Sequence, residues 1–185
     1  MDLDLPKDMD MIEDQNGFEI VYRWFSIYTV LLTVFVVLWD GFLIVLYTQA
    51  INTSNTTTLV YSLLHLAVGV GLTYYVLAGY INRTYIRVDH SLLSIKHAPL
   101  PFPGNRTVDA SDIKQVYSKA RLSRSQRDGV VTFLVTFEVH ALTHSGRNLK
   151  LLSRLVNSEH ALFIEQEIER FLHIQDAPVR GEIGR

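Results

Sequence analysis

Asp40 and His65 lie inside long apolar stretches, where ionisable side chains are rare and often functional. Asp40 is the only acidic or basic residue from Trp24 to Tyr47, and His65 lies within Leu59 to Tyr80. If the two stretches form an antiparallel helical hairpin, the two side chains lie at similar depth and can hydrogen-bond to each other. Such a polar pair could relay protons or ions, or it could fix the rotation of one helix against the other. We expect the second role, with a protonated Asp40 as the alternative.

The other residues that could do chemistry do not form a recognisable catalytic constellation. His140 and His144 are four residues apart, but they flank a strand end and a turn, and no third ligand follows at motif spacing. The glycines form no phosphate-binding fingerprint, no serine lies in a nucleophile elbow, and cysteine is absent. The sequence therefore predicts a protein that is not an enzyme and that binds no metal or cofactor.

The two apolar stretches, 24–47 and 59–80, are each long enough to cross a bilayer of about 30 Å. The first residues are too acidic for a secretory signal, so both stretches are expected to remain as membrane spans. Arg23 precedes the first span, and Arg83 and Arg87 follow the second, whereas the linker QAINTSNTTT has no charge. The positive-inside rule then predicts a multi-pass protein of the inner membrane with both termini in the cytoplasm.

Small residues in the second span predict close packing between helices. Ala67 and Gly71 are four residues apart, and Gly69 and Gly79 lie nearby. A small residue at every fourth position lets two helix backbones approach each other. We expect these positions to pack against the first span or against a second copy in a homo-oligomer.

Charge and hydropathy divide the chain into four parts. Residues 1–22 carry seven carboxylates and are expected to be a flexible acidic segment. Residues 23–81 form the membrane hairpin, 82–174 a cytoplasmic domain, and 175–185 a tail.

The cytoplasmic domain is expected to have an α+β fold. Apolar and polar residues alternate from Tyr85 to His97, which predicts a β-hairpin, and the proline-rich APLPFPGN predicts a loop. Further on, VVTFLVTFEVHAL and NLKLLSRL predict strands, and a polar loop SRSQRDG is expected before them. From Ser158, apolar residues recur at helical spacing, so one amphipathic helix is expected to close the β-rich region.

Basic residues predict a surface that contacts lipid headgroups or a partner. They gather in one stretch, and two more follow the second span: Lys114, Lys119, Arg121, Arg124 and Arg127, with Arg83 and Arg87. At the inner face of a membrane, each cation could gain about 1 kcal/mol from anionic lipids. The net charge of -2 for the whole chain and the lack of a reading motif argue against nucleic acid as the partner.

The chain also resembles a group of uncharacterised bacterial membrane proteins with two spans and a cytoplasmic pleckstrin-homology-like (PH-like) domain. The resemblance rests on HLAVGVGLTYYVLAGYINRT, HAPLPFPGNRT and ALFIEQEIERFL, in this order. It implies a PH-like fold for the β-rich region, closed by the C-terminal helix. It implies no catalytic residue and no ligand, because none is established for that group.

Together these features predict a non-enzymatic, membrane-anchored binding or scaffold module. Its cytoplasmic domain is expected to contact a protein partner or the anionic lipid surface. One alternative is a small transport or proton-coupling subunit that uses Asp40 and His65. Another is an accessory subunit of a larger membrane complex.

Overall fold

The computed structural model describes residues 5–127, 130–175, 177–179 and 181–183, and for 125–127 and 130–132 it describes the backbone alone. The chain divides into two compact units. Residues Arg23–Arg83 form one unit, here called the helical hairpin. The residues up to Tyr22 and from Thr84 onward form the other, here called the β domain. The predicted layout of two long apolar helices, a β-rich region and a C-terminal helix is confirmed.

The helical hairpin consists of α1 (Ile27–Asn52) and α2 (Thr56–Ile81). Both helices extend further into the linker than the predicted spans, so that only residues 53–55 connect them. The Asn55 side chain caps α2 by accepting a hydrogen bond from the Thr58 amide at 3.1 Å. Uncharged Gln, Asn and Thr residues are compatible with helix, and their polarity alone therefore did not mark where the helices end.

A seven-residue repeat holds the two helices together. The buried positions of α1 are Val36, Leu43 and Ala50, each seven residues after the one before. In α2 the same interval separates Ser62, Gly69 and Val76. Buried positions at this interval keep one stripe of each helix against its partner, as in a coiled coil.

The β domain contains a five-stranded sheet in which the strands follow chain order. The strands are β1 (Met9–Asp14), β2 (Gly17–Arg23), β3 (Arg83–Asp89), β4 (Leu92–Ala98) and β5 (Arg106–Asp109). The pairs β1–β2 and β4–β5 are antiparallel. Because β2 is hydrogen-bonded to β3, residues on both sides of the helical hairpin in the sequence build one sheet.

The prediction that residues 1–22 form a flexible segment is wrong from Met9 onward, since β1 and β2 belong to the β domain. Apolar residues alternate with charged ones in this segment, so that each strand has one apolar face. Met9, Phe18 and Ile20 are buried in the core, whereas the carboxylates of Asp10 and Glu19 belong to the other face of the hairpin. The high content of acidic residues concealed this alternation.

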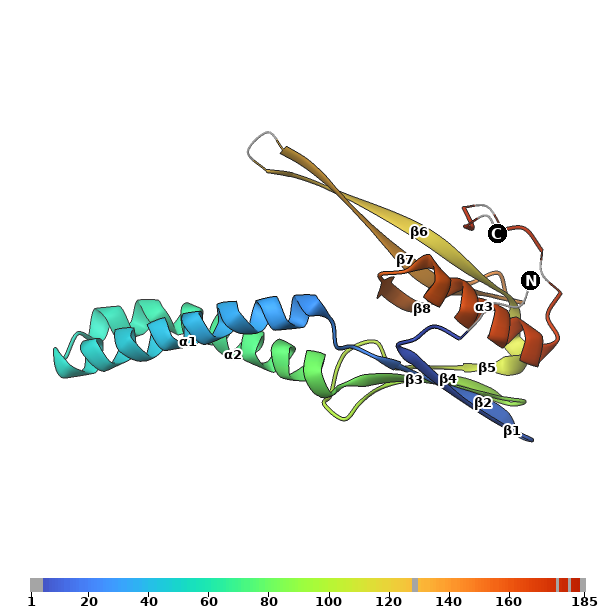
Figure 1. Ribbon diagram of the computed structural model, residues 1–185, viewed down its shortest axis with the longest axis horizontal. Helices are drawn as coiled ribbons and strands as arrows, with labels where there is room; N and C mark the ends of the chain where they lie inside the picture. Colours follow the sequence, from blue (N-terminus) through green and yellow to red (C-terminus); the bar gives the residue numbers. More distant parts are fainter. Residues whose placement is uncertain (1–4, 128–129, 176, 180, 184–185) are drawn as a thin grey trace. The chain divides into compact units, whose positions relative to one another are not determined.

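A second, three-stranded sheet consists of β6 (Ile113–Arg127), β7 (Val130–Thr143) and β8 (Asn148–Leu155), in this order and antiparallel. The stretch SRSQRDG was predicted as a loop, but its first five residues belong to β6, which ends at Arg127, opposite Val130. Its last two residues, Asp128 and Gly129, lie outside the described residues. β8 pairs with β7 only between Phe137 and Leu142. The part of β7 before Phe137 therefore forms a two-stranded ribbon with the end of β6, and this ribbon extends away from the rest of the β domain (Figure 1).

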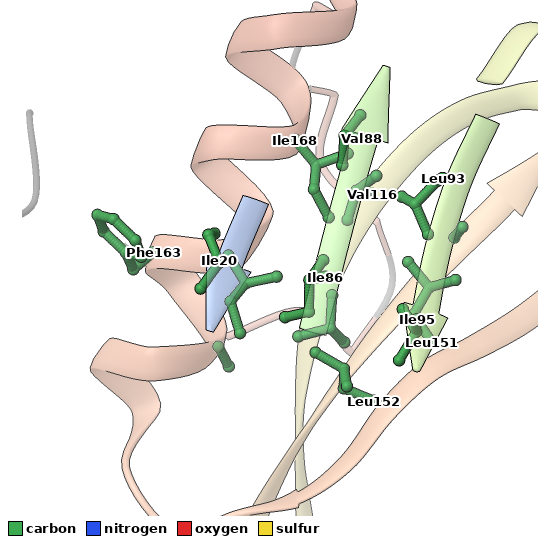
Figure 2. Close-up of a cluster of buried hydrophobic side chains, with 14 of the residues drawn as sticks. Ile20, Ile86, Val88, Leu93, Ile95, Val116, Leu151, Leu152, Phe163 and Ile168 are labelled. Carbon is green, nitrogen blue, oxygen red and sulfur yellow. The ribbon is translucent and has the colours of Figure 1, made fainter. Parts of the chain in front are cut away.

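The C-terminal helix α3 (Ser158–Leu172) joins the core that both sheets share. Its residues Ala161, Ile164 and Ile168 are fully buried, as the helical spacing predicted. Figure 2 shows Ile20 of β2 beside α3, with side chains of both sheets in the same cluster. The N-terminal strand and the C-terminal helix therefore complete one hydrophobic core.

Candidate functional site

Both helices of the hairpin are long and apolar enough to cross a membrane. A core helix of a soluble protein passes the same test, but it is mostly buried. Here only 11% of the most apolar window of α1 and 17% of that of α2 are buried. Most of the apolar surface of this unit thus faces outward, which suggests association with a membrane.

Two of the four small residues predicted to pack helices lie against α1. A Cβ atom added at Gly69 would lie 2.9 Å from Leu43 Cδ1, and one at Gly79 would lie 2.8 Å from Thr29 Cγ2. The other two, Ala67 and Gly71, are exposed, and a Cβ at Gly71 would meet no atom within 4 Å. The pair at positions 67 and 71 therefore does not mediate packing within one hairpin.

Asp40 and His65 contact different partners and not each other in the hydrogen bonds seen among the described residues. Asp40 Oδ2 accepts a hydrogen bond from Thr73 Oγ1 at 2.8 Å. The His65 ring stacks on Trp39, with ring centroids 5.9 Å apart. The two side chains lie at similar depth, as predicted, but on different faces of the hairpin, because His65 meets Trp39 and neighbouring residues of a helix project about 100° apart. Thr73, which sequence reasoning missed, takes the place assigned to His65.

An open groove of about 540 Å³ runs between the helices beside Asp40. Its lining is almost entirely apolar, with Ile44, Leu66 and Val70 among its side chains. Asp40 and Thr73 contribute polar atoms to it, and Tyr47 also lines it. The Tyr47 hydroxyl is buried and has no hydrogen-bond partner among the described residues.

The basic residues predicted to form a contact surface are exposed where their side chains are described, but they do not form one patch. Arg83 and Arg87 lie on β3 of the five-stranded sheet. The others lie on β6. The cross-strand register places Lys119 and Arg121 on one face of this strand and Arg124 on the other. Lys114 lies at the irregularity between Ile113 and Gln115. The side chain of Arg127 lies outside the described part of the structure.

Arg121 belongs to an ion-pair cluster around Glu138 of β7. Its Nη1 lies 3.1 Å from Glu138 Oε1, while Lys150 Nζ lies 3.5 Å from the same oxygen and His140 Nε2 lies 3.0 Å from Oε2. Burial opposes ionisation of Glu138, but hydrogen bonds from His140 and Arg121 and the charge of Lys150 together lower its pKa. The cluster ties all three strands of the smaller sheet together, and it engages Arg121 within the fold.

The β6–β7 ribbon exposes large apolar side chains that sequence reasoning did not single out. Leu122, Phe133 and Val135 lie on the face that continues the core side of the sheet, and they are 63%, 57% and 44% exposed. Leu134, on the opposite face, is 61% exposed. Arg124 pairs with Phe133 across the ribbon. The signal was present in the sequence, since the predicted strand VVTFLVTFEVHAL is five residues longer than NLKLLSRL, its predicted partner.

The histidines of the β domain do not gather into a ligand set. His140 Nδ1 lies 2.9 Å from Asn148 Oδ1, and its other ring nitrogen contacts Glu138, so both ring nitrogens have partners. His144 lies at the turn that follows β7 and is exposed. Among the described residues, no group of three or more His, Cys, Asp or Glu side chains could hold a metal ion.

The sequence matches no model of a protein family, and no curated protein is similar to it. Two features stand out: the helical hairpin, with its apolar exterior and Asp40, and the β6–β7 ribbon, with its exposed apolar and basic residues.

Proposed function

We propose that this protein is a non-enzymatic, membrane-anchored binding module whose β domain binds the anionic lipid surface through the β6–β7 ribbon. In this proposal α1 and α2 cross the inner membrane, and both termini lie in the cytoplasm. The apolar exterior of both helices supports the crossing, and the arginines at positions 23, 83 and 87 support the orientation.

A PH-like fold for the β domain is part of the proposal. Its support is the order of the elements, since two antiparallel sheets are followed by one C-terminal helix that packs on both. The first two strands precede the helical hairpin in the sequence, and only residues 24–26 and 82 connect the β domain to the helices. Helices that cross a bilayer would therefore hold the β domain at its surface.

The observation that carries the proposal is the exposed apolar face of the ribbon. From Val130 to Thr136, β7 pairs with β6 alone, over seven residues or about 23 Å. A two-stranded ribbon is marginally stable in water unless it packs on another surface. The side chains of Leu122, Phe133 and Val135 gain no such packing within the chain, so an external surface is expected to cover them.

Charge indicates which surface that is. Between Lys119 and Phe137 the sequence has four basic residues and a single acidic one, Asp128. Each cation near anionic headgroups gains about 1 kcal/mol, and each large apolar side chain fully removed from water gains roughly 1.5–3 kcal/mol. A few such contacts suffice to hold the ribbon, because the helices already keep the domain beside the lipid.

The topology is tested first. The chain has no cysteine, so single cysteines can be introduced at Ser54, in the turn between the helices, and at Gln175, after α3. We expect the protein to stay in membranes after an alkaline carbonate wash. A membrane-impermeant maleimide added to intact cells is expected to label Ser54→Cys and not Gln175→Cys. Recovery in the supernatant, or the reverse labelling, would contradict the proposal.

Lipid contact is tested with the full chain in nanodiscs. An environment-sensitive dye on Leu122→Cys, on the apolar face of the ribbon, is expected to shift to the blue in nanodiscs that contain phosphatidylglycerol, and less in pure phosphatidylcholine. Ile12→Cys on β1 is the matched control, since Ile12 is 66% exposed and Leu122 is 63% exposed. Arg124→Glu is expected to reduce the shift. Arg121 is not used for this purpose, because its loss would also disturb Glu138.

Lipid binding would be overturned if the dye on Leu122→Cys remained exposed to water in both kinds of nanodisc. A protein partner would then be the remaining candidate for this surface. An equal shift at Ile12→Cys would also count against the proposal, because it would show that the dye inserts without guidance from the ribbon.

A further inference from the structure

The helical hairpin has two different faces. One is the groove face, with Asp40, Tyr47 and Thr73 along the groove. The other is here called the aromatic face, where the Trp39 ring contacts both Phe35 and His65. Because successive residues of a helix are about 100° apart, Trp39 and Asp40 project to opposite sides of the line that joins the two helices.

Asp40 lies at the centre of the apolar helix. It is 13 residues from Ile27 and 12 from Asn52. A carboxyl group at the centre of a bilayer costs about 2.5–3.5 kcal/mol on insertion scales, unless it is neutralised or has partners. One hydrogen bond from Thr73 leaves most of its acceptor capacity unused. The buried Tyr47 hydroxyl is a second polar group of this groove without a partner among the described residues.

The hairpin itself contains a side chain that complements Asp40. From Trp24 to Asn82 the sequence has no Lys or Arg, and His65 is the only basic side chain. His65 is exposed on the aromatic face, and no hydrogen bond to its ring nitrogens is seen among the described residues. It lies nine residues after the start of α2 and 16 before its end, so its depth differs from that of Asp40 by only about 5 Å.

We propose that the hairpins of neighbouring copies pack with the groove face of one against the aromatic face of the next, so that Asp40 of one copy hydrogen-bonds to His65 of the other. A carboxyl and an imidazole can share one proton in either arrangement, so no separate cation is required. Because the two faces differ, the contact is heterologous, and it repeats until a ring closes. The inference rests on the membrane crossing proposed above.

The absence of cysteine makes disulfide mapping direct. Ile44 lines the groove and Tyr61 lies one helical turn from His65; both are exposed, and their depths differ by about 4.5 Å. In oxidised membranes, a chain that carries both Ile44→Cys and Tyr61→Cys is expected to give a ladder of dimers and larger species. Either substitution alone is expected to remain largely monomeric, because neither face packs against itself.

The matched control is Val45→Cys with Leu64→Cys. Both residues are exposed and lie at similar depth to the first pair, but on the outer edges of the two helices. No ladder is expected from this pair. A ladder from either single variant or from the control pair would overturn the heterologous contact.

An exchange of the two polar residues tests their contact. In the Ile44→Cys, Tyr61→Cys background, Asp40→His or His65→Asp alone is expected to reduce the ladder roughly tenfold. The two together are expected to restore it, because each contact again joins one carboxyl to one imidazole. If either residue had a merely structural role, the double exchange would not restore the ladder. Failure to restore the ladder, in protein that remains in the membrane, therefore overturns the inference.

The two proposals fail in different ways. Protein that withstands the carbonate wash but gives no ladder with Ile44→Cys and Tyr61→Cys overturns the contact between copies and leaves the membrane-anchored module standing. Protein that appears in the supernatant overturns both.

Discussion

His160 Nε2, in the first turn of α3, lies 3.1 Å from Asp8 Oδ1, just before β1. The imidazole is buried, with only 3% of its side chain exposed, and the Tyr22 ring packs edge-on against it. Burial and the nearby Asp8 carboxylate raise the pKa of Tyr22. This contact joins residues before the helical hairpin to the last helix of the chain, so the β domain needs both ends of the sequence.

The first prediction concerns this contact. Asp8→Ala is expected to destabilise the β domain by about 1–3 kcal/mol, because it leaves a buried ring nitrogen of His160 without its partner. Asp8→Asn keeps an acceptor oxygen and is expected to recover most of the loss. Thermal unfolding of the detergent-solubilised chain, followed by circular dichroism, measures both. Equal stability of the alanine variant and the unsubstituted chain would show that the contact contributes nothing.

The second prediction tests whether the N-terminal strands are part of the core. Ile20 on β2 is completely buried, and Ile20→Ala is expected to cost about 2–5 kcal/mol through lost burial and a cavity. Ile12 on β1 is 66% exposed, so Ile12→Ala is the matched control, with an expected change within about 0.5 kcal/mol. Chemical denaturation monitored by the β-sheet signal compares the two. A flexible N-terminal segment would instead give no effect for either variant.

Elements with strong local periodicity could be predicted from the sequence. The long apolar helices and α3 have patterns that extend over many residues, and such patterns are legible without knowledge of the partners. The N-terminal strands were missed because their partner β3 follows some 60 residues later, beyond both helices, and because acidic residues interleave the apolar ones.

The polar contact inside the hairpin could not be predicted because it depends on how each helix is rotated about its axis. Asp40 and His65 lie at similar depth, but Trp39, the residue before Asp40, is the one that meets His65. Thr73, eight residues after His65, lies on the side of α2 that Asp40 faces. Likewise, β6 continues past Ser123, where a loop was predicted, because its backbone pairs with β7. The polar composition of this part of the strand does not reveal that pairing.

The third prediction concerns the packing of α1 on α2. Gly69→Val is expected to push the helices apart, because even a Cβ would lie 2.9 Å from Leu43 Cδ1 and 3.0 Å from Asp40 Oδ1. Gly71→Val makes the same chemical change in the same helix at a position with open space around it, so it is expected to be tolerated.

A reporter for this effect is available at the other end of the hairpin, where Thr33 Oγ1 and the Tyr80 hydroxyl lie 3.0 Å apart. With cysteines at both positions, a short bifunctional maleimide is expected to cross-link the two helices. The yield is expected to fall several-fold with Gly69→Val and to stay unchanged with Gly71→Val. Equal yields in the two backgrounds would contradict the close approach at Gly69.

The last prediction is a pH dependence that originates at Glu138. The pKa of this carboxyl is lower in the folded protein than its ordinary value of 4.5, because the hydrogen bonds from His140 and Arg121 and the charge of Lys150 outweigh its burial. The unfolded chain therefore binds a proton at a higher pH than the folded one. The stabilisation is complete above about 4.5 and is lost as the pH falls through the lowered pKa.

Glu138→Gln removes the charge and is expected to cost about 1–3 kcal/mol at neutral pH. The gap in stability between this variant and the unsubstituted chain is expected to narrow as the pH is lowered below 4.5, because protonation then removes the same charge from Glu138. Asp109→Asn, which removes an exposed carboxylate of β5, is the control and is expected to show a small gap. Chemical denaturation at a series of pH values measures both gaps. A gap for Glu138→Gln that stays constant down to the acid limit of folding would mean that the ion pairs around Glu138 do not stabilise the β domain.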